Sequence, residues 1–233
     1  MKVVVVLPGY NCEQTLRKTY MSIPMEYVND VVYVDDGSSD NSLIIAKSLH
    51  INYIIPHSHN IGYGGNQKTL YDKAIDLGAD VIILLHPDYQ YDPLLIPTIL
   101  NKFNNGADVV FASRMKKGKE SVRLGMPKYK YYANRLLTAI QNYTFNQKLS
   151  EYHTGYRAYK ADVLRNIKYH NLSNDFVFDN QLTLEIIRNH YRIDEVYCPA
   201  KYERDSSSIN FIRSVKYGFL VLWYTFVYKL KFF

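Results

Sequence analysis

The chain has 233 residues, of which 47% are hydrophobic and 21% charged, and 28 Lys+Arg against 22 Asp+Glu leave a formal net charge of +6. This is the composition of a globular protein with one sizeable core, and it excludes a disordered or collagen-like chain. With only Cys12 and Cys198, the sequence also excludes a disulfide framework and favours a reducing, cytosolic setting.

The N-terminal apolar run, residues 3–7, is too short for the hydrophobic region of a signal peptide and lacks a small-residue cleavage site. We therefore expect the protein to stay where it is made. Tyrosine is unusually frequent, with 23 residues. Two explanations remain open: a compositional bias of the source organism, or a function in base stacking or in seating at a membrane interface.

Short, continuous apolar runs recur in the first half of the chain, at residues 3–7, 31–34, 81–85 and 109–112. Such runs are typical of strands buried on both faces of a sheet. The stretches between them have the apolar spacing of helices: residues 13–23, 41–49, 65–77 and 93–103. This alternation predicts an α/β, Rossmann-like fold with a mostly parallel central sheet flanked by helices. Ligands of such sheets bind where the strands end.

The second half begins with a stretch that has no periodicity, residues 113–130, which is rich in Lys and Arg and contains two glycines. This composition predicts a mobile basic loop. Helical spacing returns at residues 131–143, 161–167 and 179–190, and residues 192–196 resemble a short strand. No linker or internal repeat interrupts the chain, so we expect one domain over residues 1–210.

The C-terminal segment, residues 211–233, contains an uncharged run from Tyr217 to Tyr228 between Lys216 and Lys229. A helix of this run would rise roughly 18 Å, short of the ~30 Å hydrocarbon core of a bilayer. Aromatic and aliphatic residues between basic ones suit an amphipathic helix that lies in a membrane interface. A C-terminal helix packed on the domain is the alternative.

Polar and turn-forming residues follow the first two apolar runs, at ends predicted to share one edge of the sheet. Pro8 shapes a turn, Tyr10 offers a ring on which a base can stack, and Asn11 follows. Asp35 and Asp36 close the second run, and two adjacent carboxylates exceed what a helix cap requires. We choose Asp36, nearer the turn, to accept the N–H groups of a nucleobase.

The first predicted strand is not followed by Gly-x-Gly-x-x-Gly, and no predicted strand leads into a P-loop motif. The sequence therefore does not favour a dinucleotide-binding protein or a P-loop nucleotide-binding protein. Residues 60–66 are nevertheless rich in glycine and include Gly65. Glycine permits close approach of the backbone to a ligand, which favours a nucleotide-binding segment. A plain loop is the alternative.

The most informative stretch follows the apolar run at residues 81–85. Asp88 and Gln90 alternate in an extended segment, so they can point the same way, at one hard cation held against a diphosphate. Asp92 precedes a proline and is expected to cap the next helix.

The order of these motifs resembles that of the family 2 inverting glycosyltransferases, which have the fold called GT-A. Within them it is most similar to the dolichyl-phosphate mannose synthases and related polyprenyl-phosphate glycosyltransferases. The similarity spans roughly residues 2–208, and it rests on the segments 8–11, 34–38, 88–90, 113–114 and 155–157. Its specificity lies in the ordered set rather than in any one motif.

The resemblance implies a nucleoside-diphosphate sugar as donor and a divalent metal, Mg²⁺ or Mn²⁺, held on its diphosphate by Asp88 and Gln90. Arg114 and Arg157 would reach phosphate groups near the transfer point. The nucleotide-binding set would be Pro8, Tyr10, Asn11, Asp35, Asp36, Gly65, Arg204 and Ser208.

One departure from the family pattern concerns the metal. The family usually shows Asp-x-Asp, and here His86 occupies the first acidic position, where it is either a metal ligand or a hydrogen-bonded wall of the site. A neutral imidazole lowers the negative charge of the site, so Mg²⁺ would be held more weakly, whereas Mn²⁺ accepts nitrogen more readily.

We therefore expect a peripheral enzyme at the cytoplasmic face of the membrane that moves a hexose from UDP or GDP to a polyprenyl phosphate, with inversion. An anionic phosphate acceptor needs no strong base. The alternative acceptor, a sugar hydroxyl in a surface polysaccharide, does need one, and Asp179 is the candidate. A third possibility is a non-catalytic nucleotide- or membrane-binding protein. Nucleic acid is not an expected partner.

Overall fold

Strands and helices alternate along the chain, of which a computed structural model describes residues 1–199 and 211–231. The strands are β1 (Val3–Gly9), β2 (Asp30–Asp35), β3 (Tyr53–Pro56), β4 (Val81–Leu84), β5 (Val109–Ser113), β6 (Arg157–Lys160) and β7 (Ile193–Tyr197). The α-helices are α1 (Leu16–Met21), α2 (Ser42–Ser48), α3 (Tyr63–Asp76), α4 (Ile96–Asn104), α5 (Glu120–Arg123), α6 (Lys128–Phe145), α7 (Ala161–Asn166), α8 (Phe178–Arg188) and α9 (Phe211–Lys231). Three 3₁₀ turns are η1 (Met25–Tyr27), η2 (Pro93–Leu95) and η3 (Tyr169–Asn171).

The strands described form one sheet of seven, in the order β3-β2-β1-β4-β6-β5-β7. β1 pairs parallel with β2 and β4, and β5 pairs parallel with β7. β6 runs antiparallel between β4 and β5. The predicted α/β fold with a mostly parallel sheet is therefore confirmed. The sequence pattern does not indicate β6, because its four residues begin with Arg157 and end with Lys160.

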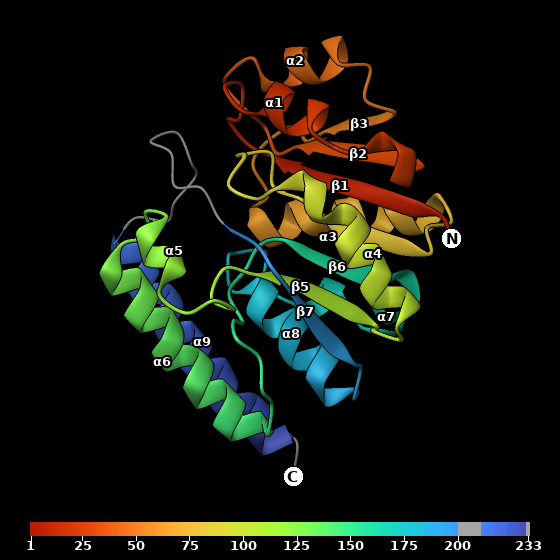
Figure 1. Cartoon of the computed structure of the whole chain (residues 1–233). Helices are drawn as coiled ribbons and strands as arrows, with labels where there is room; N and C mark the ends of the chain where they lie inside the picture. The colour runs from red at the N-terminus through yellow and green to blue at the C-terminus, as the bar shows by residue number, and fades with distance from the viewer. Residues whose placement is uncertain (200–210, 232–233) are drawn as a thin grey trace.

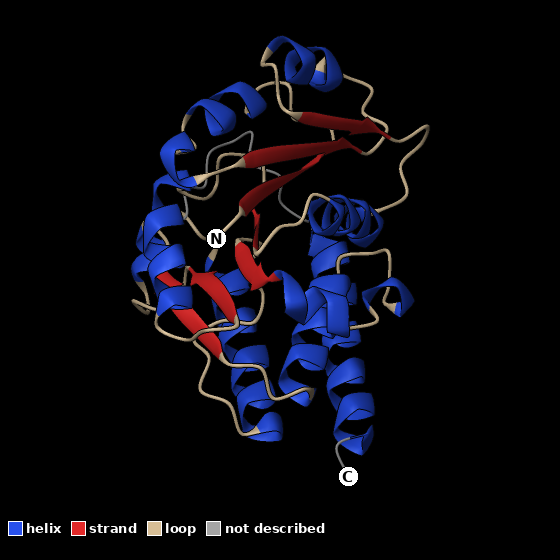
Figure 2. Cartoon of the chain, turned by 90° about the vertical axis from the view of Figure 1, so that its right-hand side faces the viewer, coloured by secondary structure: helices blue, strands red, loops and turns tan. Residues whose placement is uncertain are grey.

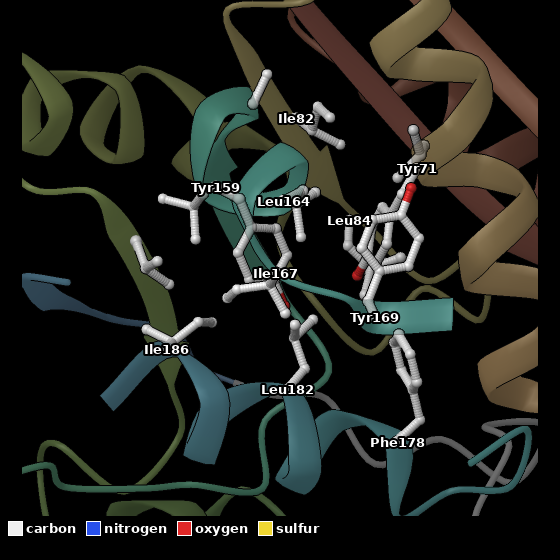
Figure 3. Packing of buried hydrophobic residues seen from close by; sticks show 14 of the residues in the cluster. Tyr71, Ile82, Leu84, Tyr159, Leu164, Ile167, Tyr169, Phe178, Leu182 and Ile186 are labelled. Atoms are coloured by element: carbon white, nitrogen blue, oxygen red, sulfur yellow. The ribbon is translucent and has the colours of Figure 1, made fainter. Parts of the chain in front are cut away.

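Helices cover both faces of the twisted sheet (Figure 2). Odd-numbered apolar residues of β1 pack with those of α1, α2 and α4, whereas the even-numbered ones pack with α3, α7 and α8. Figure 3 shows the second cluster, where Tyr71 of α3, Tyr159 of β6 and Phe178 of α8 come together. Burial on both faces explains why the strands are continuous apolar runs rather than alternating ones.

The segment predicted to be a mobile loop, residues 113–130, is partly helical. It contains α5, and α6 begins before the segment ends. Met115 and Met126 pack with Tyr131 of α6 in a small apolar cluster separate from the two main ones. The two buried methionines of this charged segment are too far apart in the sequence to show a helical period.

The C-terminal helix α9 lies beside α6 (Figure 1) and also contacts α8. Its inner face buries Val221, Thr225 and Tyr228; the Thr225 hydroxyl accepts from Gln141 Nε2 at 3.2 Å, and the Tyr228 hydroxyl donates to Glu185 at 2.8 Å. The outer face exposes large apolar side chains: Val215, Phe219, Leu222, Trp223, Phe226 and Leu230. α9 is thus amphipathic, as expected, and the alternative of a packed helix holds for one of its faces. Among the described helices, none is both long enough and apolar enough to cross a membrane.

The glycines at the start of α3 make room for the protein's own chain. A Cβ at Gly64 would lie 2.5 Å from the Ser173 carbonyl oxygen and 2.7 Å from Phe178 Cβ. A Cβ at Gly65 would lie 3.0 Å from Ile61 Cγ1. The structure does not support the expectation that Gly65 makes room for a nucleotide, because the space beside it is filled by protein.

Replacing Gly64 by alanine is expected to lower the free energy of unfolding by about 1–3 kcal/mol, because the added methyl group overpacks the contact between α3 and α8. Urea denaturation would measure it. Gly218→Ala is the matched control: this glycine is also helical, and an added Cβ meets nothing within 4 Å. The control should be neutral or gain up to about 1 kcal/mol of helix propensity. Equal effects of the two variants would contradict the packing argument.

Candidate functional site

The segments that follow β1 and β2 meet at one edge of the sheet and are joined by hydrogen bonds. Asn11 donates its backbone N–H to Ser38 Oγ at 3.0 Å, and its side-chain oxygen accepts from the Ser39 N–H at 2.9 Å. Asp35 is buried and accepts from the Ser38 N–H at 3.0 Å. Tyr10 is 54% exposed. Asn11 and Asp35 therefore shape this edge, and Tyr10 is the group that it presents to solvent.

Asp36 is buried, with 2% of its surface exposed, and its carboxylate is used within the chain. Oδ1 lies 2.8 Å from His57 Nδ1 and accepts from the Ile61 N–H at 3.0 Å, and Oδ2 accepts from the Gly62 N–H at 3.2 Å. Asp36 thus holds the segment that leads from β3 into α3. The structure does not support its expected direct contact with a nucleobase.

Three side chains from distant parts of the sequence form a hydrogen-bonded row at this edge. The Tyr63 hydroxyl, in the first turn of α3, donates to Asp179 Oδ2 at 2.7 Å and lies 3.1 Å from His86 Nε2. The rings of Tyr63 and His86 are parallel, with centroids 5.5 Å apart. Burial, then the charge of Asp179, raises the pKa of Tyr63 well above its usual value. Burial lowers the pKa of His86, although Asp88 and Asp179 oppose this shift.

Asp88 and Gln90 lie just beyond β4, as expected from their position after an apolar run. The expectation of an extended segment is wrong, because the chain turns here and Tyr89 between them has a left-handed φ of 56°. Asp88 is partly exposed, and its Oδ1 accepts from the Gln90 backbone N–H at 3.1 Å. Within residues 1–199 and 211–231, no three His, Cys, Asp or Glu side chains are gathered to hold a metal ion. Mg²⁺ is usually held by one or two carboxylates together with substrate phosphates and water. The oxygen donors of Asp88 and Gln90 therefore fit a cation whose other ligands come with the diphosphate.

Arg114, at the end of β5, is paired with the fully buried carboxylate of Glu151. Its Nε donates to Glu151 Oε1 at 3.0 Å, its Nη2 makes a second bond to the same oxygen, and its backbone N–H donates to Oε2 at 2.8 Å. Nη2 also donates to the His153 carbonyl at 2.9 Å. The guanidinium charge is thus balanced inside the protein. Contact of Arg114 with a phosphate stays a prediction.

Arg157, in β6, is fully buried, and its guanidinium N–H groups donate hydrogen bonds within the protein. Nε donates to the Thr154 carbonyl at 2.7 Å and Nη2 to the Tyr152 carbonyl at 2.8 Å. Nη1 donates to the Asp179 carbonyl at 2.8 Å and to Thr183 Oγ1 at 2.9 Å. The expectation that Arg157 meets a phosphate disagrees with this geometry. Its guanidinium instead joins β6 and the segment before it to the first turn of α8.

Helix α9 begins beside this edge. The Tyr217 hydroxyl lies 2.8 Å from His153 Nδ1, and their rings meet edge to face. Burial, followed by the charges of Arg157 and Arg114, lowers the pKa of His153 to about 3. His153 is therefore neutral and serves as a polar contact between the site and the C-terminal helix.

The remaining predicted residues divide into two groups. Pro8 lies near the end of β1, whereas Arg204 and Ser208 lie outside the described residues. Sequence inspection misses Tyr63 and Glu151, which lie at the centre of the site. Tyr63 had one available signal, a bulky aromatic residue within a run of glycines; Glu151 had none.

Comparison with known proteins decides the family. The profile described as Glycosyl transferase family 2 matches residues 4–168, more than half of the chain. The chain belongs to this family. It is therefore a glycosyltransferase, and the resemblance seen in the ordered motifs is confirmed.

Three similar glycosyltransferases are named for lipid substrates, and two of the names specify a lipid phosphate. The chain is 27% identical over 180 residues to the UDP-N-acetylglucosamine–dolichyl-phosphate N-acetylglucosaminyltransferase of Methanococcus voltae, which covers 70% of this chain and 71% of that protein. It is 28% identical to the dolichol-phosphate mannosyltransferase of Pyrococcus furiosus over 51% of this chain and 34% of that protein. A prophage bactoprenol glucosyl transferase homolog of Escherichia coli is 27% identical over 72% of this chain and 55% of its own length.

A solved glycosyltransferase structure supports the fold assignment. Glucosyl-3-phosphoglycerate synthase from Mycobacterium tuberculosis, in complex with Mn²⁺, UDP and phosphoglyceric acid, superposes with a TM-score of 0.71. The match covers 98% of this chain and 78% of that chain, at 16% sequence identity. The GT-A fold expected from the sequence is therefore confirmed.

Replacing Arg157 by methionine is expected to lower the free energy of unfolding by about 3 kcal/mol or more, because buried acceptors and the Asp179 carboxylate lose their partner. Chemical denaturation of the free enzyme would measure this loss. Arg165→Met is the control, since it removes an exposed ion pair with Asp162, worth at most about 1 kcal/mol, and one long hydrogen bond of 3.4 Å to the Ala79 carbonyl. If Arg157→Met kept full stability but lost phosphate binding, the framework role would be wrong.

Proposed function

We propose that this glycosyltransferase moves a hexose from UDP or GDP to a polyprenyl phosphate at the cytoplasmic surface of a membrane, with inversion at the anomeric carbon. The observation that carries the proposal is the position of α9. Its Tyr217 contacts the candidate site, and its outer face is apolar over the turns that follow. The lipid-phosphate acceptors in the names of the relatives agree with it.

The outer face of α9 has the chemistry of a membrane-interface surface. Phe219 is 71% exposed and Trp223 59%, and a shallow groove lined by both includes Lys216. The adjacent helix α6 also exposes large apolar side chains: Tyr129, Tyr132 and Leu136. Large exposed apolar patches mark protein or membrane contacts. Basic residues near both ends of α9 favour a membrane over a protein partner, because each contributes about 1 kcal/mol of binding free energy at an anionic leaflet.

The donor would bind at the edge formed by the ends of β1, β2 and β4. Tyr10, exposed there, supplies a ring for stacking on the base, and Asn11 keeps the two loops together. Asp88 and Gln90 would hold a divalent cation against the diphosphate. Such a cation would neutralise the negative charge that develops on the leaving diphosphate. The family resemblance also assigns Arg204 and Ser208 to nucleotide binding.

The reaction demands little acid–base chemistry of this chain. A phosphate acceptor is already anionic, so it attacks the anomeric carbon without losing a proton to the protein. The enzyme contributes alignment, because in-line attack opposite the leaving diphosphate requires both substrates to be held. The buried framework of Arg157 and Glu151 keeps the walls of the site rigid, and neutral His86 and His153 add no positive charge to it.

One observation favours a second candidate, transfer to a sugar hydroxyl. Asp179 Oδ1 is buried and has no hydrogen-bond partner in the described part of the chain, so it offers a free lone pair for a hydroxyl proton. Labelled sugar nucleotides, incubated with Mn²⁺ and a short polyprenyl phosphate, distinguish the two. Label extracted into organic solvent supports the lipid acceptor. Label that stays in water-soluble glycan supports the hydroxyl acceptor, and no transfer despite nucleotide binding contradicts both.

Asp88→Ala is expected to reduce transfer at least ~10²-fold, because it removes the carboxylate at the proposed metal position and leaves the diphosphate charge less compensated. Gln90→Ala should have a milder effect. Initial rates at several Mn²⁺ concentrations measure both. Asp162→Ala, which removes an exposed carboxylate far from this edge, is the control. Wild-type turnover and metal dependence in Asp88→Ala would show that the metal assignment is wrong.

Substituting the exposed aromatic residues of α9 should release the protein from anionic vesicles. The triple variant Phe219→Asn, Trp223→Asn, Phe226→Asn removes apolar burial in the interface, and we expect at least a tenfold loss of binding in flotation. The buried residues of α9 stay unchanged, so the fold and nucleotide binding should persist. Ile44→Asn, an exposed position on α2, is the control. Undiminished flotation of the triple variant would remove α9 from the membrane contact.

A further inference from the structure

The two hydrogen bonds of the Tyr63 hydroxyl, to Asp179 and to His86, determine which atoms carry the protons. The Tyr63 hydroxyl has a single proton, and it donates this proton to Asp179 Oδ2 at 2.7 Å. Its oxygen can then only accept from His86 Nε2, which lies 3.1 Å away. A neutral imidazole carries one N–H. That N–H is therefore on Nε2, and Nδ1 carries a lone pair.

The position of the ring leaves that lone pair accessible. The Nε2–Cδ2 edge of His86 faces Gly155, where a Cβ would lie 2.8 Å from both atoms, and the same edge contacts Tyr63. Nδ1 lies on the other side of the ring and has no hydrogen-bond partner in the described residues. The residue as a whole is partly exposed, and Nδ1 is not among the buried polar atoms that lack a partner in the described part of the chain, so the atom is open to a ligand.

We propose that Tyr63, held by Asp179, is a positioning residue that fixes the Nε2–H tautomer of His86 and so provides Nδ1 as a nitrogen ligand beside Asp88. The ligand class is a divalent transition-metal ion such as Mn²⁺, for which imidazole is a better donor than it is for Mg²⁺. Metal-binding histidines commonly donate their second N–H to a carboxylate, directly or through another group, which fixes the ring. Here the Tyr63 hydroxyl connects His86 to the Asp179 carboxylate. The inference rests on the proposed donor site, but it makes no use of the acceptor.

The tautomer itself can be measured without any reaction. In ¹⁵N-labelled protein at neutral pH, a long-range ¹H–¹⁵N spectrum should show His86 with Nε2 protonated and Nδ1 unprotonated, assigned by the loss of these signals in His86→Asn. Tyr63→Phe should remove the preference for this tautomer. Tyr156→Phe is the matched control, because it removes a buried hydroxyl that, unlike that of Tyr63, has no hydrogen-bond partner within residues 1–199 and 211–231. A protonated Nδ1 in the wild type, or an unchanged tautomer in Tyr63→Phe, would overturn the inference.

Metal affinity supplies the second readout. Mn²⁺ titrations in the presence of UDP, and separately of GDP, should show about 10–100-fold weaker binding to Tyr63→Phe than to the wild type or to Tyr156→Phe. Mg²⁺ affinity should change much less. Unchanged Mn²⁺ affinity would show that Nδ1 is not a ligand, even with the tautomer as inferred.

A second pair of variants does not depend on the folding of Tyr63→Phe. The amide of His86→Gln can reach the position of Nε2 but leaves nothing at Nδ1, whereas the amide of His86→Asn places its oxygen near Nδ1. We expect His86→Gln to lose more Mn²⁺ affinity than His86→Asn, and the reverse order would contradict the proposal. Failure of transfer to polyprenyl phosphate would overturn the proposed function while leaving these binding results valid.

Discussion

The buried guanidinium of Arg157 is the interaction on which the arrangement of the site depends. It lies in β6, which runs antiparallel to both neighbouring strands, and its donors satisfy carbonyl groups of the preceding segment and of the first turn of α8. A fully buried cation is costly unless it is paired and hydrogen-bonded, and Arg157 is both. Arg157 thereby fixes the position of Asp179. Asp179 in turn holds Tyr63, whose hydroxyl contacts His86.

The acidic residues at the carboxyl edge mostly hold the protein together rather than face a ligand. Asp36 binds two backbone N–H groups and a histidine, and Glu151 neutralises Arg114. A glycosyltransferase that must accept a diphosphate gains from this arrangement, since each carboxylate turned inward is one fewer negative charge facing the donor. Asp88, partly exposed, remains as the carboxylate proposed to face it through a cation.

Much of the fold follows from the sequence because buried parallel strands are marked by local apolar runs, and because Asp92 caps η2 as its position before a proline predicts. The ordered motifs likewise locate the edge that carries the site. What cannot be predicted is how each polar group is used. The bond from Tyr63 to Asp179 joins residues 116 positions apart, and β6 is stabilised by pairing with two strands rather than by any pattern of its own. Such contacts depend on the assembled fold.

The close contact between His86 and Gly155 has an evolutionary consequence. Because the imidazole edge occupies the space that a side chain at position 155 would need, the two positions are epistatic: a large ring at 86 requires a glycine at 155. Exchanging His86 alone for the shorter aspartate typical of the family would leave a void beside Gly155 and remove the ring that stacks on Tyr63. A side chain at position 155 would therefore be accommodated only after the ring at position 86 had moved or been replaced by a smaller group.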